Sequence, residues 1–192
     1  MYLVAGLGNP GAKYARNRHN VGFMVLEGFA AQHGAPAPRE RFQGAFTKLR
    51  VGNDDVGLLW PATFMNLSGR AVQQAMHFFK IELDRLVVVH DELDLPFGDV
   101  RIKLGGGTAG HRGLASIVEC CGGTGFCRVR VGIGRPPSGK VESWVLQDFS
   151  AQDSAALPSV LERASASLAD IMARGAQAAM NLHNRRPDSG SN

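Results

Sequence analysis

Short apolar runs alternate with segments of helical spacing along most of this 192-residue chain, and this alternation constrains the fold more than any other feature. The runs are rich in Val, Leu and Ile, which is typical of strands, and they cover residues 2–5, 45–51, 56–60, 86–89, 100–104 and 129–133. The second and third runs are separated by only a few residues around Asn53-Asp54, which predicts a hairpin. The sequence therefore predicts one α/β domain, with a twisted mixed sheet flanked by helices on both faces.

The segments between the strands predict where the helices lie. Apolar residues recur at helical spacing over residues 20–33, 68–79 and 113–121, and again after Phe149. We expect Ser68 to cap the second of these helices and Pro158 to break the last one. The domain is expected to span residues 1–184. The polar tail at 185–192, which contains Pro, Gly and Ser, is expected to be disordered.

The composition is that of an ordinary globular protein, with 44% apolar residues. No stretch approaches the roughly 20 consecutive apolar residues that a bilayer requires, and the first residues do not resemble a signal peptide. The three cysteines are too few and too clustered for a disulfide framework, which fits a reducing compartment. We therefore expect a cytoplasmic protein without membrane contact.

Basic residues are concentrated in two blocks, although the net charge is only +4. Residues 1–50 and residues 99–140 each hold 7 Lys or Arg against 2 acidic residues, and the second block is also rich in glycine. Consecutive glycines let backbone N–H groups approach an anion, so this block predicts an anion site, unless it is a solvated face with tight turns. Further phosphate contacts are expected from Lys103, Arg112, Arg128 and Arg130.

A histidine and an acidic residue form the most informative pair. His19 lies among arginines and asparagines, and a histidine that acts as a base near neutral pH needs a carboxylate to orient its ring. Asp91 directly follows a buried-looking strand, where no structural need requires an acid, so we predict that it pairs with His19. The rival interpretation is a metal site formed by His90, Asp91, Glu92 and Asp94. Consecutive residues of an extended chain point to opposite faces, which disfavours that site.

The turn after the first strand, Gly6-Leu7-Gly8-Asn9-Pro10-Gly11, matches the dinucleotide motif G-x-G-x-x-G. The match is poor, because Pro10 lacks an N–H and no strand ending in an acid follows about 20 residues on. We expect the turn to present Asn9 at the carboxyl end of a strand, where open α/β sheets bind ligands. Asn66, in the loop before the second helix, is a candidate to bind a substrate amide or carbonyl.

Covalent catalysis has no obvious nucleophile in this chain. The sequence lacks both the G-x-S-x-G elbow of serine hydrolases and the H-E-x-x-H motif of zinc proteases. A histidine, an acid and nearby asparagines point instead to direct attack by an activated water.

Longer motifs resemble those of the bacterial peptidyl-tRNA hydrolase family. They are GLGNPG, Y-A-x-x-R-H-N-x-G, TFMNLSG, VVHDELDLPFG, KLGGG, RVRVGIGRP and the ending A-A-M-N-L-H-N. They occur in the family's order and cover the chain up to its tail. The resemblance implies a monomeric, cytoplasmic enzyme, without metal, cofactor or obligate protein partner. Such an enzyme hydrolyses the ester between a peptide and the terminal ribose of tRNA.

The resemblance also implies roles for individual residues. His19 is the catalytic base, Asp91 orients it, and Asn9 and Asn66 bind substrate. The remaining binding residues are Tyr14 at the tRNA end, Met65 in the cleft wall, and Lys103 and Arg130 at the tRNA 5′-phosphate. Many members have Gly-His-Asn-Gly where this chain has Gly110-His111-Arg112-Gly113, so the role of that asparagine does not carry over. We expect His111 and Arg112 to bind substrate, and Arg112 to contact phosphate or the terminal ribose, because arginine donates but does not accept hydrogen bonds.

Two other functions compete with this one. Organellar relatives of the family serve as RNA-splicing factors, and a protein that only binds RNA needs the basic face but not the His19–Asp91 pair. The presence of both residues, together with Asn9 and Asn66, favours the enzyme. A nicotinamide-dependent oxidoreductase rests on the glycine motif alone.

Overall fold

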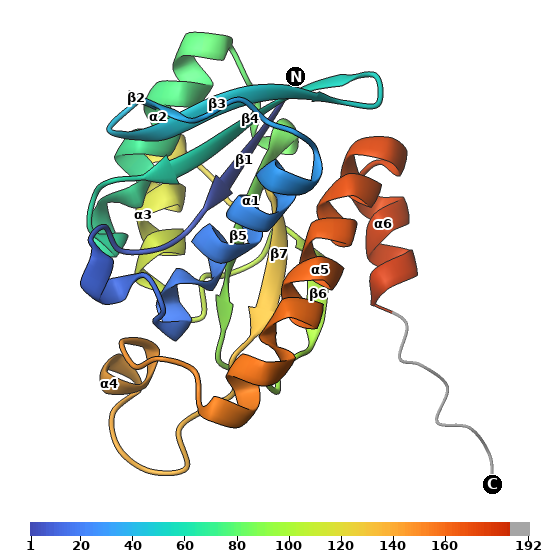
Figure 1. Cartoon of the computed structure of the whole chain (residues 1–192). Coiled ribbons are helices and arrows are strands. Elements are labelled where there is room, and N and C mark those ends of the chain that lie inside the picture. Colours follow the sequence, from blue (N-terminus) through green and yellow to red (C-terminus); the bar gives the residue numbers. More distant parts are fainter. Residues whose placement is uncertain (185–192) are drawn as a thin grey trace, which may run out of the picture.

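A computed structural model describes residues 1–184 (Figure 1). The strands are β1 (Tyr2–Gly6), β2 (Arg39–Arg41), β3 (Gly44–Val51), β4 (Asp54–Pro61), β5 (Leu86–Glu92), β6 (Val100–Leu104) and β7 (Cys127–Gly132). The helices are α1 (Val21–Gln32), α2 (Ser68–Phe79), α3 (Arg112–Cys121), α4 (Val141–Val145), α5 (Ala151–Arg174) and α6 (Ala176–His183). The predicted disordered tail lies outside the described residues.

The sheet is mixed, as predicted, with the strand order β2-β3-β4-β1-β5-β7-β6. The central strands β4, β1, β5 and β7 run parallel to one another, whereas β2, β3 and β6 pair antiparallel with their neighbours. β1 has a parallel neighbour on each side, so its carboxyl end lies where the connections diverge. Open α/β sheets bind ligands at such a point.

Helices cover both faces of the sheet (Figure 1). One face packs on α1, α5 and α6 around Val4, Val87 and Val129, and the other packs on α2 and α3 around Leu3 and Val88. Side chains of a strand alternate between faces, so a strand buried on both faces requires a continuous apolar run. This explains why the runs that predict the strands show little alternation. None of the helices in the described part of the chain has the length and apolar character needed to span a bilayer.

Two local predictions at the helices are wrong. Ser68 is the first residue of α2, and its hydroxyl donates to the carbonyl of Met65 rather than capping the helix. A 3-10 turn at Met65–Leu67 leads into α2, and Ser116 of α3 accepts the N–H of Gly69. Pro158 does not break α5, which runs without interruption to Arg174. Pro158 is exposed, so the carbonyl that it leaves without an N–H partner lies on the side of the helix that faces solvent.

Strand β2 is absent from the prediction because it carries none of the apolar signal. Its residues Arg39–Arg41 are exposed at the edge of the sheet, where only backbone pairing with β3 makes them a strand. The turn that follows holds Phe42 and Gln43 at positive φ, 55° and 54°, as a tight hairpin requires.

Glycines bring α1 against the sheet. A Cβ added at Gly22 would lie 2.4 Å from the carbonyl oxygen of Val89 and 2.5 Å from the nitrogen of Leu7, and one at Gly6 would lie 2.6 Å from the carbonyl oxygen of Gly22. Only glycine permits this approach. The G-x-G turn therefore serves helix packing, and it places the residues before α1 over the carboxyl ends of β1 and β5.

Candidate active site

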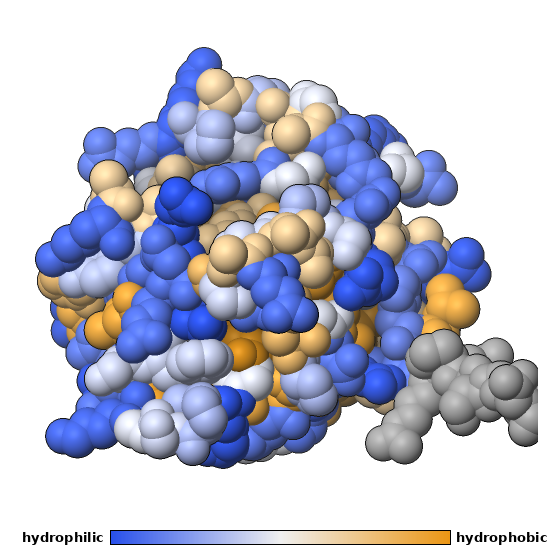
Figure 2. Space-filling view, turned by 60° about the horizontal axis from the view of Figure 1, so that its bottom comes forward, coloured by the Kyte–Doolittle hydropathy of each residue, from blue (hydrophilic) through white to orange (hydrophobic). Residues whose placement is uncertain are grey.

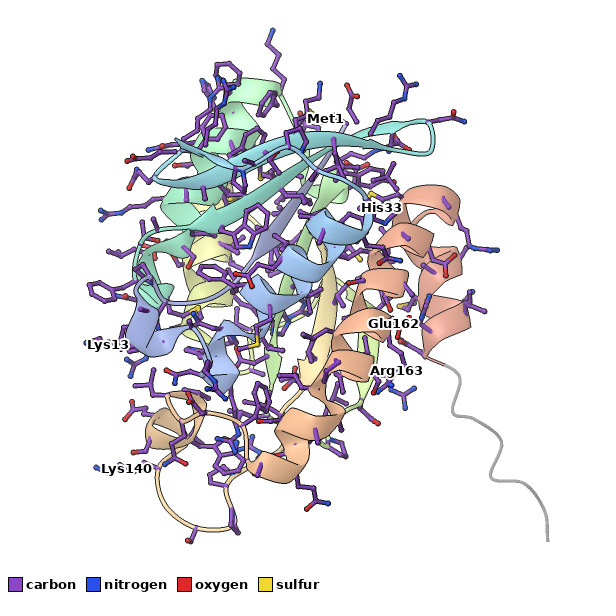
Figure 3. The ribbon with its side chains drawn as sticks, in the orientation of Figure 1. Met1, Lys13, His33, Lys140, Glu162 and Arg163 are labelled. Carbon is purple, nitrogen blue, oxygen red and sulfur yellow. The ribbon has the colours of Figure 1, made fainter. Side chains whose placement is uncertain are left out.

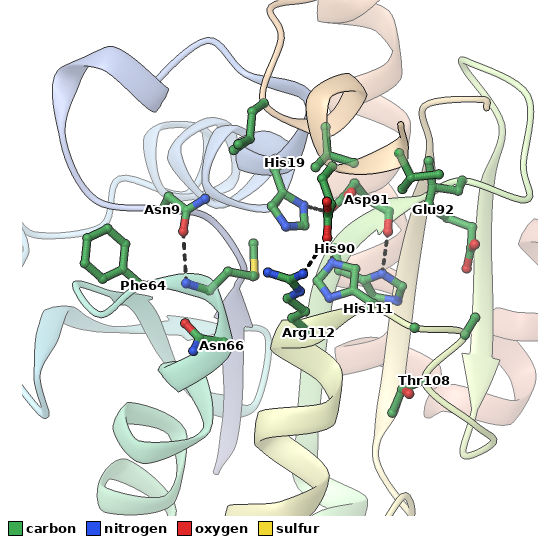
Figure 4. A pocket seen from close by; sticks show the side chains of 18 residues that line it. Asn9, His19, Phe64, Asn66, His90, Asp91, Glu92, Thr108, His111 and Arg112 are labelled. Carbon is green, nitrogen blue, oxygen red and sulfur yellow. Dashed lines mark hydrogen bonds and ion pairs between the residues drawn. The ribbon is translucent and has the colours of Figure 1, made fainter. Parts of the chain in front are cut away.

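A pocket of about 280 Å³ opens at the carboxyl ends of β1 and β5 (Figure 4). Its lining comes from residues 9, 19, 64–66, 90–93, 108–112, 141, 142, 145 and 146. The face around it is mostly hydrophilic (Figure 2), and two exposed apolar side chains, Phe64 and Leu146, belong to the lining. The pocket thus combines Asn9 and His19 from the N-terminal segment with the acidic end of β5 and the glycine loop.

His19 and Asp91 form the predicted pair. His19 lies on a 3-10 turn, Arg18–Asn20, directly before α1, and its Nδ1 is 2.8 Å from Oδ1 of Asp91 at the end of β5. The carboxylate accepts, so Nδ1 carries the proton. Nε2 is then unprotonated, and it has no hydrogen bond to any residue of 1–184. A ring held in this way can take a proton from a molecule in the pocket.

His111 contacts the same carboxylate oxygen, with its Nε2 2.9 Å from Oδ1 of Asp91. Its Nδ1 accepts the N–H groups of Gly113 and Leu114 and thereby caps α3. Nδ1 is therefore unprotonated and Nε2 is the donor. Burial opposes the charge on Asp91, but electrostatic attraction and hydrogen bonds from His19 and His111 outweigh it and hold the pKa of the carboxyl well below its usual range.

His90 lies under this pair without joining it. Its ring is buried, Nδ1 is 2.7 Å from the carbonyl oxygen of Asp91, and it packs edge-on against His111. Burial, and then electrostatic repulsion by His111 when that ring is protonated, lower the pKa of His90 to about 3. His90 is therefore neutral at physiological pH.

Hydrogen bonds to Asn9 fix the orientation of its side-chain amide. Its Oδ1 accepts the N–H of Met65 at 2.9 Å, while the side chain of Asn20 bonds both to the N–H and to the carbonyl of Asn9. With Oδ1 occupied, the two N–H bonds of Nδ2 remain as donors at the pocket. Asn20 is not among the predicted site residues, and its only signal in the sequence is its place directly after His19.

The four residues of the rival metal site do not converge. Glu92 bonds to Arg130 and Asp94 to Arg135, while His90 faces the backbone. A different trio, His19, Asp91 and His111, has its ligand atoms within 4.8 Å of one another. This trio does not fit a metal, because Nε2 of His111 holds a proton for as long as Nδ1 caps α3.

The other predicted residues divide into two groups. Met65 is buried in the pocket wall, and Asn66 and Arg112 are exposed at its lining. The second group, Tyr14, Lys103 and Arg130, lies outside the lining. Lys103 is exposed on β6, on the same face of the sheet as Arg130.

Two of the side chains expected to contact phosphate, both on β7, already have partners within the protein. Nε of Arg130 is 2.9 Å from Oε2 of Glu92. The guanidinium of Arg128 is buried and donates to the carbonyls of Gly105 and Gly107, which shapes the glycine loop. Lys103 forms no ion pair among residues 1–184 and is thus the most available cation of this face.

Arg18 is a structural residue that the sequence analysis did not single out. Its buried guanidinium lies 3.6 Å from the centre of the Trp144 ring and donates to the carbonyls of Trp144 and Gln147. Asn17 adds a hydrogen bond to Asp148. These contacts fasten the α4 segment to the turn that carries His19, so α4 forms the outer wall of the pocket.

The fold is that of an α/β protein whose pocket holds a histidine paired with a buried carboxylate. Residues 3–190 match the family model for peptidyl-tRNA hydrolase. A peptidyl-tRNA hydrolase of Sorangium cellulosum is 52% identical over 99% of this chain and 86% of its own, and one of Syntrophomonas wolfei is 44% identical over 96% and 100%. The crystal structure of peptidyl-tRNA hydrolase from Acinetobacter baumannii superposes with a TM-score of 0.90 at 35% identity, covering 96% of this chain and 94% of that one. The chain belongs to the peptidyl-tRNA hydrolase family.

Proposed function

We propose that this protein hydrolyses the ester bond of peptidyl-tRNA with a water molecule activated by His19. The observation that carries the proposal is the hydrogen bond from Nδ1 of His19 to Asp91, which leaves Nε2 free at the pocket. Membership of the family supplies the substrate.

In this mechanism Nε2 of His19 removes a proton from water as the oxygen attacks the ester carbonyl. The bond from the carbonyl carbon to the ribose oxygen of the tRNA then breaks, and that oxygen takes the proton back from His19. Asp91 stabilises the imidazolium that forms, and its very low pKa keeps it ionised throughout. General base catalysis contributes about 10²–10⁴-fold, so other groups supply the rest of the acceleration. We infer that His111 acts through Asp91 rather than by touching substrate, since both of its ring nitrogens are occupied.

The developing oxyanion needs donors close to His19. Nδ2 of Asn9 is the best candidate, because its partner atom Oδ1 is fixed by Met65 and the amide cannot turn without losing that bond. Asn66 lies on the same side of the pocket and is the second candidate. Prearranged donors of this kind lower the barrier without reorganisation.

The tRNA is proposed to lie over the basic residues around the pocket. Lys103 and Arg130 lie on the sheet face beside the glycine loop, where they would contact the 5′-phosphate, and Tyr14 lies on the turn before His19. Lys13 and Lys140 project outward from the same end of the molecule (Figure 3). The monomeric state and the cytoplasmic location stay predictions.

The direct test is to incubate the protein with N-blocked aminoacyl-tRNA and to measure release of the blocked amino acid. We expect release by the wild-type protein. Binding of the tRNA without release would support the alternative of an RNA-binding protein and contradict the enzyme.

A second measurement tests the basic face. Lys103→Gln should raise the Michaelis constant for the tRNA substrate, and it should reduce the slope of log affinity against log salt by about 0.9, the value for one lost phosphate contact. Lys48→Gln, which removes another exposed lysine far from the pocket, is the matched control. An equal loss on a minimal ester without RNA would show that Lys103 serves the fold or the chemistry instead.

A further inference from the structure

The pocket lining carries more acidic than basic residues, although the proposed ligand is a nucleic acid. Among the described residues of the lining, Arg112 is the one Lys or Arg, beside three acids: Asp91, Glu92 and Glu142. Asp91 is held by the two histidines and Glu92 by Arg130. Glu142 has Arg112 as its partner, with Nη2 of Arg112 2.6 Å from Oε1 of Glu142.

The pair joins α3 to α4 across the pocket, and both side chains are largely exposed, 68% for Arg112 and 69% for Glu142. An ion pair in water contributes little to stability, so Arg112 can leave Glu142 easily. Its position is also an unfavourable one for a cation, because Arg112 is the first residue of α3 and the helix dipole repels positive charge there. The fold thus gains little from an arginine at this place.

We propose that Arg112 binds a phosphodiester of the single-stranded 3′ end of the tRNA, and that Glu142 occupies Arg112 when no substrate is bound. The proposal rests on the proposed function, which brings that end of the tRNA to His19. The planar guanidinium forms paired hydrogen bonds to phosphate oxygens as well as to a carboxylate, so one partner replaces the other without loss of geometry.

The chemistry of the substrate favours the phosphodiester over the peptide as the ligand of Arg112. The carboxyl of the peptide is esterified at the reacting bond and carries no charge, whereas each nucleotide of the 3′ end carries one. Figure 4 shows Arg112 between Asn66 and the Asp91 side of the pocket, so a strand that ends at His19 passes close to it.

If the phosphodiester and Glu142 compete for Arg112, substitutions of Arg112 and of Glu142 should change the affinity for RNA in opposite directions. With a short single-stranded RNA of the tRNA 3′ end as the probe, Arg112→Gln should raise Kd about tenfold and reduce the slope of log affinity against log salt by about 0.7. Glu142→Gln should lower Kd several-fold, because it frees Arg112. A latch that only closes the pocket would instead make both variants change Kd in the same direction.

The controls are Lys48→Gln and Asp55→Asn, which break an exposed pair on β3 and β4 and change the net charge by the same amounts. They should leave Kd within about twofold of wild type, since one distant surface charge is largely screened. Shifts in the controls equal to those at Arg112 and Glu142 would overturn the proposal. So would a loss in Arg112→Gln that is as large on a minimal ester as on the tRNA substrate.

Binding of the probe does not depend on hydrolysis, so the two proposals fail separately. A wild-type protein that releases no amino acid but shows the opposite Kd shifts would contradict the esterase and support Arg112. A protein that hydrolyses peptidyl-tRNA while both variants bind the probe like wild type would contradict the role of Arg112 alone.

Discussion

Within residues 1–184, two histidine–aspartate pairs have the same separation, and one of them, His19–Asp91, lines the pocket described above. His19 and Asp91 meet at 2.8 Å between the turn before α1 and the end of β5, and His183 and Asp170 meet at 2.8 Å between α6 and α5. Asp91 is almost fully buried, whereas a quarter of the Asp170 side chain is exposed. The residue types alone therefore do not identify a catalytic pair.

The difference lies in the other contacts of each ring. The second nitrogen of His183 is 3.2 Å from the buried hydroxyl of Ser167, and Asp170 is shared with Arg174. Arg174, and then His183, lower the pKa of Asp170, so this cluster fastens α6 to α5. Among residues 1–184, Nε2 of His19 has no hydrogen-bond partner, and Asp91 is held by a second histidine. A free ring nitrogen, rather than the pair itself, distinguishes a base from a structural contact.

The largest expected effect on kcat comes from comparing two single variants, one for each histidine. His19→Ala should lower kcat for N-blocked aminoacyl-tRNA by about 10²–10⁴-fold, because the general base is lost, and should leave tRNA affinity nearly unchanged. His183→Ala should keep kcat within about twofold and lower the free energy of unfolding by about 1 kcal/mol. Comparable turnover by the two variants would remove the distinction between the pairs.

Substitution of the two aspartates should also affect kcat differently, but by a smaller factor than substitution of the histidines. Asp91→Asn keeps an oxygen that can accept from both histidines but loses the negative charge, and a hydrogen bond to a charged group contributes about 1.5–3 kcal/mol, roughly 10–100-fold in kcat. Asp170→Asn should leave kcat within about twofold of wild type. A kcat of Asp91→Asn equal to that of wild type would contradict its proposed role.

The smallest expected effect is on the free energy of unfolding. It tests whether water reaches the buried ring of His90, next to Asp91. The pKa of His90 falls from 6.5 to about 3 on folding, so between these values the unfolded chain binds the extra proton. The free energy of unfolding should therefore fall as pH is lowered through this window, by up to about 1.4 kcal/mol per pH unit. His90→Phe should flatten this slope in urea titrations from pH 7.5 to 4.5. A slope equal to that of wild type would mean that His90 is hydrated.

Local sequence predicts much of the fold and part of the site, though not all of either. Apolar runs located six of the seven strands to within a few residues, because burial on both faces demands them; only the exposed β2 lacked that signal. Asp91 was identified because an acid directly after a buried strand has no role in packing. Ser68 and Pro158 misled the prediction, because a preceding 3-10 turn and an exposed helix face changed what those residues do.

The sequence by itself determined the α/β class and the mixed sheet, since the alternation of apolar runs with helical spacing is a local property. It also predicted from residue types that Asp91 pairs with His19. Only the tertiary structure decided that His111 shares Asp91, that Asn9 turns its N–H groups to the pocket and that Arg112 faces Glu142. Those partners lie 20 to 56 residues apart in the chain. Which atoms meet across such separations depends on how the helices pack, and no local pattern encodes it.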